Sequence, residues 1–394
     1  MRRRRRRPSN PFWIITLLVL IAAAWYFNKK VVPTIPPLFE SSPTPTRSPE
    51  SFINEAEEYF KAGKLSQAIT SYKGAIRSDP TNPSIYIALA RVQVFAGLYE
   101  DALETTGNAL ILNSSNSMAY AVKGWALDFL RDYLPAEAAV KKAIELDPNN
   151  ALAYAYYAEI LLDRGIYEDQ EKAIEMSRKA RDLAPNTLET HRIRGYVFWA
   201  TTNYEEALQE YKAALAINDK LWDLHYSLGV VYRDMGTYDQ AEQEFIQASS
   251  LNPTNPDILT EASRMNITAG QYGKAVQYAE QALKIDPSNP RLHGNLGFSL
   301  YKNRQYEEAV SEFALAVQGG TTKEGVVVKG LPLASGRVAD EYYSYYGLAL
   351  AKLNRCNDAV PIFQLILQNI AEDQNAYANA QEGIQTCQEE PGGS

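Results

Sequence analysis

Three histidines are the side chains in this sequence best suited to metal binding or to proton transfer. His191, His225 and His293 each occupy the fourth position of a repeated unit described below. Ligands of one metal must meet within a few ångströms, whereas equivalent positions on neighbouring packed helices lie roughly 8–10 Å apart. We therefore predict that these histidines pack between helices and bind no metal. The sequence contains no P-loop, nucleophile elbow or HExxH motif, so we expect no catalytic residue, no cofactor and no enzyme activity.

Basic side chains are concentrated at the start of the chain. Residues 1 to 47 carry nine basic residues against one acidic residue, a net charge of +8; since the whole chain carries −8, residues 48 to 394 carry −16. An acidic body lacks the basic stripe that neutralises nucleic-acid phosphates. We therefore expect no nucleic-acid partner for the folded part.

An uncharged apolar run follows this basic tail, which covers residues 1–10. Pro11 to Phe27 contains no charged residue and has aromatic side chains near both ends; as a helix it spans roughly 25 Å, at the short edge of a membrane crossing. Six arginines precede it and two lysines follow, so the positive-inside rule places the N-terminus in the cytoplasm and the rest outside. We predict a signal-anchor at 11–32 and a single-pass protein of the cell membrane and envelope.

Two other interpretations of this segment remain open. A basic start, a short apolar core and Ala22 to Ala24 also fit a cleaved secretory signal, which would export the domain equally well. The arginines could in addition bind anionic lipid. Residues 33–49 are rich in proline, which favours an extended, semi-rigid spacer between membrane and body.

The rest of the sequence is a repeat. A small residue in a common local pattern recurs at a spacing of 34 residues, with one step of 37 and one of 50; these residues are Ala68, Ala102, Ala136, Ala173, Ala207, Ala241, Ala275, Ala309 and Ala359. A second small position, such as Gly124 or Gly229, precedes each of them, and a tyrosine often lies three residues before. Proline ends several units, as at Pro80 and Pro148, because it cannot continue a helix.

This pattern resembles the tetratricopeptide repeat (TPR), in which each 34-residue unit is two antiparallel helices. The resemblance covers about residues 49 to 390. It implies an all-α, right-handed superhelical solenoid of about nine helix-turn-helix repeats, preceded by one transmembrane helix, with repeats 1–8 at 50–318 and repeat 9 and a capping helix at 340–390. Each unit buries its apolar face only by stacking on its neighbours.

The step of 50 residues marks an insertion at 319–339. Its β-branched residues lie between glycines, which favours a short hairpin or an ordered loop over a helix. Long insertions in compact arrays are often functional. Contact with a partner and packing over the last repeat are both open for this segment.

The resemblance also implies where a partner binds, because TPR proteins hold target peptides on the concave face formed by first-helix positions 2, 5, 9, 12 and 13. Aromatic and arginine side chains, which often anchor interfaces, occupy these positions here. The predicted groove residues are Arg91, Phe95, Trp125, Phe129, Arg192, Tyr196, Trp199, Tyr226, Arg233, Arg264, Phe298 and Tyr301. Packing between first helices is the alternative role for each. The Lys and Asn that clamp a C-terminal carboxylate in some TPR domains are replaced by Ile53 and Glu57.

The two cysteines fall at one end of the predicted array. Cys356 takes the hairpin-tip position that tyrosine holds elsewhere, and Cys387 lies near the end of the capping helix. In an oxidising compartment a disulfide there would tie down a fraying end; two unpaired buried thiols are the alternative.

Taken together, these features predict a membrane-anchored, non-catalytic scaffold that binds a protein or peptide in its groove. An assembly factor for an envelope, pilus or secretion machine is an alternative of the same kind. A carbohydrate-binding or enzyme-associated module is an alternative of a different kind, because aromatic grooves also stack on sugars.

Overall fold

The structure is a computed structural model that describes residues 11–31 and 47–389. The predicted basic tail and most of the proline-rich linker lie outside these residues. The chain divides into two units, Met1–Ser48 and Pro49–Ser394, which are described separately.

The first unit contains one apolar helix. Helix α1 (Pro11–Tyr26) continues into a π-helical turn, η1 (Phe27–Val31), and none of the α1 side chains is buried. The span Pro11–Lys30 is long and apolar enough to cross a membrane by length and composition, a test that a secretory signal also passes. Both interpretations of this segment therefore stay open in the structure.

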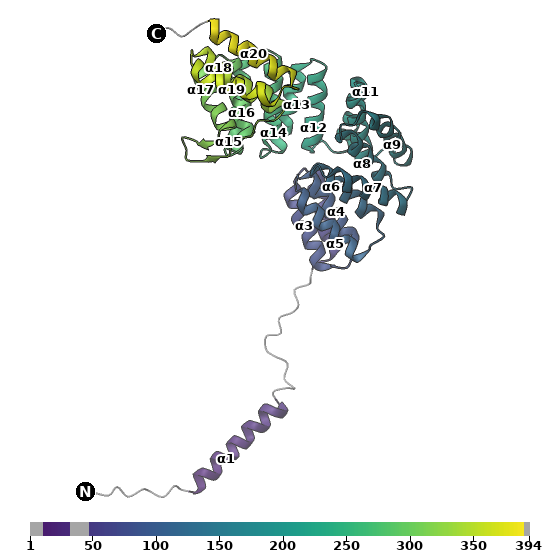
Figure 1. Ribbon diagram of the computed structural model, residues 1–394. Helices are drawn as coiled ribbons and strands as arrows, with labels where there is room; N and C mark the ends of the chain where they lie inside the picture. The colour runs from purple at the N-terminus through teal and green to yellow at the C-terminus, as the bar shows by residue number, and fades with distance from the viewer. Residues whose placement is uncertain (1–10, 32–46, 390–394) are drawn as a thin grey trace, which may run out of the picture. The chain divides into compact units, whose positions relative to one another are not determined.

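The second unit, the body, is an α-helical solenoid (Figure 1). Its helices are α2 (Pro49–Lys61), α3 (Leu65–Ser78), α4 (Pro83–Phe95), α5 (Tyr99–Leu112), α6 (Ser117–Phe129), α7 (Tyr133–Leu146), α8 (Ala151–Asp163), α9 (Gln170–Leu183), α10 (Leu188–Ala200), α11 (Tyr204–Ile217), α12 (Trp222–Asp234), α13 (Tyr238–Leu251), α14 (Pro256–Thr268), α15 (Tyr272–Ile285), α16 (Pro290–Lys302), α17 (Tyr306–Val317), α18 (Ser344–Lys352), α19 (Cys356–Asn369) and α20 (Gln374–Glu389). Even-numbered helices from α2 to α18 are the first helices of nine hairpins within the described residues, and α20 packs on α18 and α19 as a cap.

The loops between hairpins explain where each first helix begins. In several loops an asparagine caps the next helix by accepting a hydrogen bond from its first turn; Asn82 accepts from Ser84 N at 3.0 Å and Asn116 from Ala119 N at 3.0 Å. Such a cap satisfies an amide that the helix itself leaves unpaired. The preceding second helices end one residue before an X-Pro pair, as α7 does at Leu146 before Asp147 and Pro148.

Small residues let the two helices of a hairpin approach closely. A Cβ built on Gly229 would lie 2.8 Å from the ring of Phe245, and one on Gly297 would lie 2.8 Å from the ring of Phe313. The equivalent alanines on the second helices, including Ala241 and Ala309, are fully buried. The core therefore runs along the whole array between paired helices.

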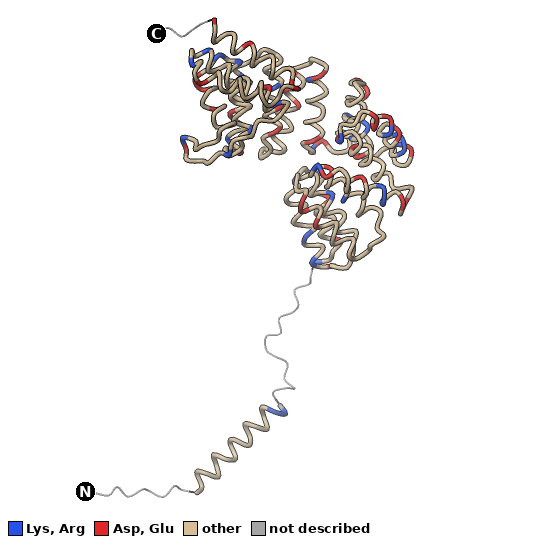
Figure 2. The backbone as a smooth tube through the Cα atoms, viewed as in Figure 1, with Lys and Arg blue, Asp and Glu red and all other residues tan. Residues whose placement is uncertain are grey.

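The long insertion is ordered. Strands β1 (Gly320–Thr321) and β2 (Val327–Val328) form an antiparallel hairpin, and a π-helical segment, η4 (Val338–Tyr343), then leads directly into α18. The three extra residues of repeat 4 form a 3-10 turn, η3 (Tyr167–Asp169), at the hairpin tip. Lys and Arg are interspersed with Asp and Glu along the described body (Figure 2).

A two-part concave groove

The first helices of the body carry the predicted groove residues on the face that lines the inside of the superhelix. Helical periodicity places the chosen positions of each first helix on one side, and stacking of the repeats aligns those sides. Two of the cavities on the resulting surface, an outer cavity of about 660 Å³ and an inner cavity of about 210 Å³, are lined by most of the predicted groove residues.

The outer cavity lies over the first helices of repeats 5 to 8. Six of the twelve predicted groove residues line it: Tyr196, Trp199, Tyr226, Arg233, Arg264 and Phe298. The rings of Tyr196 and Trp199 stack with centroids 5.6 Å apart. Trp199 donates its Nε1 hydrogen to Asp234 at 2.8 Å, which fixes the orientation of the indole. These side chains are half-buried, so their faces remain partly accessible.

The arginines of the outer cavity are held by acidic side chains. Arg233 donates to Glu261 at 2.5 Å and to Asp234 at 2.8 Å. Arg264 forms a bidentate pair with Glu341 at 2.6 and 2.8 Å, the geometry that suits a planar guanidinium best. Hydrogen bonding therefore fixes both guanidinium groups where they line the groove.

The end of the insertion and the start of repeat 9 add residues to the groove that were not predicted. Arg337, the residue before η4, lines the outer cavity, and Glu341 of η4 holds Arg264 in place. Tyr342 is fully buried and donates to Asn295 at 2.9 Å, which fastens η4 to α16. Arg337 lies in the insertion, outside the repeat numbering, so the 50-residue step was the one signal for it. Glu341 falls at first-helix position 2 of repeat 9, counted from Ala359, and could have been located from the sequence.

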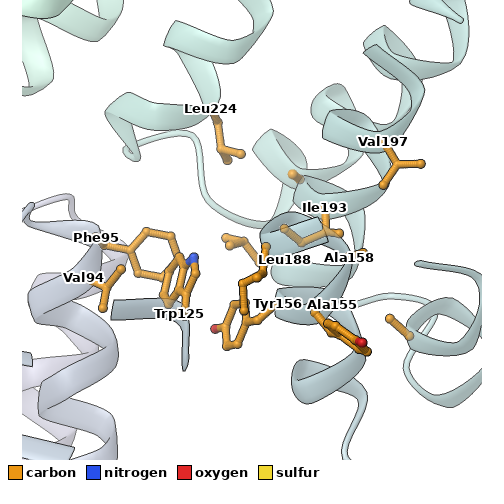
Figure 3. Close-up of a cluster of buried hydrophobic side chains, with 14 of the residues drawn as sticks. Val94, Phe95, Trp125, Ala155, Tyr156, Ala158, Leu188, Ile193, Val197 and Leu224 are labelled. Carbon is orange, nitrogen blue, oxygen red and sulfur yellow. The ribbon is translucent and has the colours of Figure 1, made fainter. Parts of the chain in front are cut away.

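The inner cavity lies deeper, where several predicted groove residues are packed. Phe95, Trp125 and Arg192 line it but are only 3%, 1% and 8% exposed. Trp125 lies between Phe95 and Tyr156, with ring centroids 5.0 and 4.5 Å away (Figure 3). At these three positions the structure favours packing, the alternative role, over exposure in an open groove, because the superhelix coils tightly enough to cover them.

Three contacts join distant repeats, and one of them lies at the inner cavity. Trp222 at the start of α12 donates to the carbonyl of Phe95 at 3.0 Å. Asn218 donates to the carbonyl of Phe60 at 3.3 Å, and Arg91 forms an ion pair with Glu189 at 2.5 Å. The tips of repeats 1 and 2 therefore contact the starts of repeats 5 and 6.

The remaining predicted residues lie at the edges. Phe129 is 37% exposed, lines the inner cavity and stacks on Tyr99. Arg91 lies over the rings of Phe60 and Phe95. Tyr301 contacts the ring of Tyr345 and lines neither cavity.

Acidic groups in and beside the inner cavity have perturbed proton affinities. Burial, with the nearby charges of Asp163 and Glu159, raises the pKa of Asp128 to about 10. Burial also raises the pKa of Asp163, against the opposing effects of a hydrogen bond from Tyr196 and the charge of Arg192. A pKa of about 10 keeps Asp128 protonated at neutral pH, beside the carboxyl group of Asp163.

The histidines pair with carboxylates on the second helix of the same repeat. The Nδ1 atoms of His191, His225 and His293 lie 2.7, 2.6 and 2.6 Å from Glu210, Glu244 and Glu312. All three pairs are separated by nineteen residues, a signal that could have identified the partners from the sequence. Burial lowers the pKa of His225 and His293, but the glutamate hydrogen bonds outweigh it and raise the pKa of both. Within the described residues, no three His, Cys, Asp or Glu side chains group as metal ligands.

The two cysteines form a disulfide. Cys356 at the start of α19 is bonded to Cys387 near the end of α20, with Cα atoms 5.5 Å apart. The bond ties the capping helix to the tip of the last hairpin.

Comparison with known proteins identifies the repeat. Family models described as "TPR repeat" match residues 56–94 and 195–236. Models described as "Tetratricopeptide repeat" match residues 119–150, 139–175, 226–290 and 266–318. Together these matches cover more than half of the chain.

Curated relatives share shorter segments. The DnaJ homolog subfamily C member 7 homolog of Schizosaccharomyces pombe is 27% identical over 143 residues, 35% of this chain and 30% of that protein. Hsp70-Hsp90 organizing protein 2 of Arabidopsis thaliana is 26% identical over 143 residues, 36% of this chain and 23% of that protein. The chain spans less than a third of the length of these relatives.

Solved structures resemble the fold. The Cut9 and Hcn1 hetero-tetramer of the APC/C matches with a TM-score of 0.57 at 15% identity, covering 66% of this chain and 51% of that chain. A monomeric mutant of IFIT1 matches with a TM-score of 0.59 at 16% identity, covering 84% and 80%. At these identities the likeness shows a helical-repeat solenoid and nothing finer.

Proposed function

Because the chain belongs to the tetratricopeptide-repeat family, we propose that it is a membrane-anchored scaffold that holds a segment of a partner protein in the outer cavity of its concave groove. Family membership and the relatives support the broader role, a protein-interaction scaffold. We propose three further points beyond this role: the outer cavity as the binding site, the membrane anchor, and a location of the body outside the cytoplasm.

The observation that carries the proposal is the outer cavity. It combines a volume of about 660 Å³ with half-buried aromatic faces and hydrogen-bonded arginines contributed by successive first helices. Preorganised aromatic and arginine side chains in a pocket are the usual anchors of protein interfaces. A groove that crosses several repeats suits an extended or helical segment, since its contacts are spread along a line.

Two features support the anchor and export. Helix α1 has the length and composition of a membrane span, and the six arginines before it favour a cytoplasmic N-terminus. The disulfide between Cys356 and Cys387 suits an oxidising compartment, where such bonds persist. Both features favour a body outside the cytoplasm.

The stacked pair of Tyr196 and Trp199 favours one alternative ligand, a carbohydrate, because flat aromatic faces also stack on sugar rings. The ion-paired arginines beside this pair favour a protein segment, since guanidinium groups in fixed positions suit carboxylates and backbone carbonyls. A photo-crosslinking experiment in cells separates these ligands, since only a protein partner gives a discrete crosslinked protein.

Photo-crosslinking in cells tests the proposal. A benzophenone amino acid replaces Thr268, an exposed residue of the outer cavity, and in a matched control it replaces Ile246, which is 52% exposed on the second helix α13. We expect a discrete crosslinked protein from position 268 and none from position 246. The same protein captured at both positions, or none at position 268, contradicts a groove-bound partner.

A further inference from the structure

Two arginines of the concave face share one arrangement. The guanidinium of Arg91 lies 5.4 Å from the ring of Phe60 and pairs with Glu189. The guanidinium of Arg192 lies 5.1 Å from the ring of Trp125 and forms a bidentate pair with Glu159 at 2.9 and 2.6 Å. In both cases a cation is held between an aromatic face and a carboxylate, which is an attractive arrangement in a dry site.

The inner cavity also contains aromatic faces and carboxyl groups, and its lining holds more carboxyl groups than cations. Tyr99 and Phe129 form a stacked pair with centroids 4.7 Å apart and rings inclined by 4°, and Trp222 lies in the same lining. Asp163 and Asp223 contribute carboxylates. Oδ1 of Asp223 is buried and has no hydrogen-bond partner among the described residues.

The charges of this lining do not balance. Arg192 is the one cation among the residues that line the inner cavity, and Glu159 already neutralises it. Asp128, beside the cavity, is protonated and contributes no charge. Asp163, Asp223 and Glu159 therefore share this one guanidinium. Burial raises the pKa of both Asp163 and Asp223, while the charge of Arg192 opposes that shift. A further cation in this space would favour their ionised forms.

The inner cavity adjoins the outer one. Tyr196, Tyr211, Tyr226 and Ser227 line both cavities. A side chain that branches from a segment in the outer cavity therefore needs to pass only these four residues to enter the inner one. The volume of about 210 Å³ suits one long side chain rather than a folded element.

We propose that the inner cavity binds a lysine or arginine side chain of the partner segment, held between the Tyr99 and Phe129 pair and the carboxylates of Asp163 and Asp223. This inference rests on the proposed function, since the same groove must hold the segment. It adds a sequence requirement: a cationic residue within a stretch that lies along repeats 5 to 8.

The test uses the full chain in detergent and fluorescein-labelled peptides of one length. The flanking positions are randomised, and the central residue is fixed as lysine, arginine, norleucine or glutamate. We expect the lysine and arginine sets to bind about tenfold more tightly than the norleucine set, with glutamate weakest. Asp223→Asn, which keeps the shape and removes the charge, should abolish this preference and leave binding of the norleucine set unchanged.

Two further variants complete the design. Phe129→Leu removes an aromatic wall without changing the charge and should reduce the same preference, which keeps the test valid if Asp223→Asn does not fold. Asp219→Asn alters an exposed carboxylate in the loop before α12 and should change nothing.

The outcomes separate the two proposals. Equal binding of the lysine and norleucine sets overturns the cationic pocket but leaves the groove intact as a peptide site. Displacement of the lysine set by n-butylammonium alone, at concentrations comparable to the peptide, overturns a peptide-borne occupant in favour of a small amine. Binding of no peptide set, together with no crosslink at position 268, overturns both proposals.

Discussion

Asp128 shows how the coiling of the array changes the chemistry of a single residue. Its side chain is 2% exposed, and neither carboxyl oxygen has a donor among the described residues. Asp163, Glu159 and Arg192 are the charged groups that act on it. Because burial and two like charges outweigh one arginine, the folded protein holds a proton on Asp128 that the unfolded chain releases above about pH 4.

This proton makes the stability of the body depend on pH. A folded-state pKa of about 10 exceeds the unfolded value, so the contribution of Asp128 is fully favourable below about pH 4 and is lost as the pH rises toward 10. We expect Asp128→Asn, which mimics the protonated form, to raise the free energy of unfolding at pH 7 by about 1–3 kcal/mol. Urea unfolding between pH 5 and pH 9 measures this change.

The pH profile supplies the control for this prediction. Asp128→Asn should flatten the fall in stability across that range, whereas Asp132→Asn, at an exposed position of the same hairpin, should leave the slope unchanged. A variant that keeps the parent's slope between pH 5 and pH 9 would show that Asp128 is already ionised in the folded protein.

At the residue scale, the sequence identified which residue types face inward. It did not identify which of these side chains contact one another. Trp199, Tyr226 and Arg264 were predicted for the groove and line the outer cavity. Asp128 and Asp163 come from different repeats, and their contact depends on how two first helices approach each other. No spacing within one repeat encodes that approach.

At the scale of the hairpin, the sequence specifies almost everything. Small residues on facing helices set the helix separation, and proline and asparagine set where helices end and begin. The hairpin tips also repeat a left-handed residue, which is glycine in most repeats but Arg131, Thr202, Arg304 or Asn354 in others. In the sequence, tyrosine indicates the hairpin tip. The left-handed residue cannot be recognised in the same way, because its type varies from repeat to repeat.

The close approach at Gly229 leads to a prediction for one hairpin. An added methyl group at this position meets the ring of Phe245 at 2.8 Å, whereas at Gly273 on α15 it meets nothing within 4 Å. We expect Gly229→Ala to lower the free energy of unfolding by about 1–3 kcal/mol through overpacking. Gly273→Ala should be neutral or stabilising by up to about 1 kcal/mol, because alanine favours the helix.

Thermal unfolding followed by circular dichroism distinguishes the two variants. Equal melting temperatures would mean that α12 and α13 can separate at no cost, against the packing described for every hairpin.

At the scale of the whole molecule, the repeat spacing predicted the solenoid, whereas it could not predict the closure of the groove. The number of repeats per superhelical turn depends on small rotations summed over several hairpins, and one-residue changes in loops alter it. The contact of Trp222 with Phe95 forms because these rotations together bring the start of α12 against the end of α4. This is why the predicted single groove became an outer and an inner cavity.

Membrane topology is the second property at this scale, and a reporter fused to the C-terminus tests it. Alkaline phosphatase, which is active only after export, should be active in the fusion, and a cytoplasm-dependent fluorescent protein should be dark. Exchanging Arg2 to Arg7 for glutamate should weaken or invert this pattern, because the charge bias sets the orientation. Cytoplasmic reporter activity in the unaltered chain would contradict the proposed location.

The contacts of Asn218 with Phe60 and of Trp222 with Phe95 also change how the body responds to load. An open solenoid can be extended one repeat at a time, since each repeat contacts only its neighbours. Here hydrogen bonds join the first two hairpins to the fifth and sixth. These bonds must break before the repeats between them can be extended. A force applied to the N-terminal end of α2 therefore acts first on these contacts, and the inner cavity keeps its shape until they break.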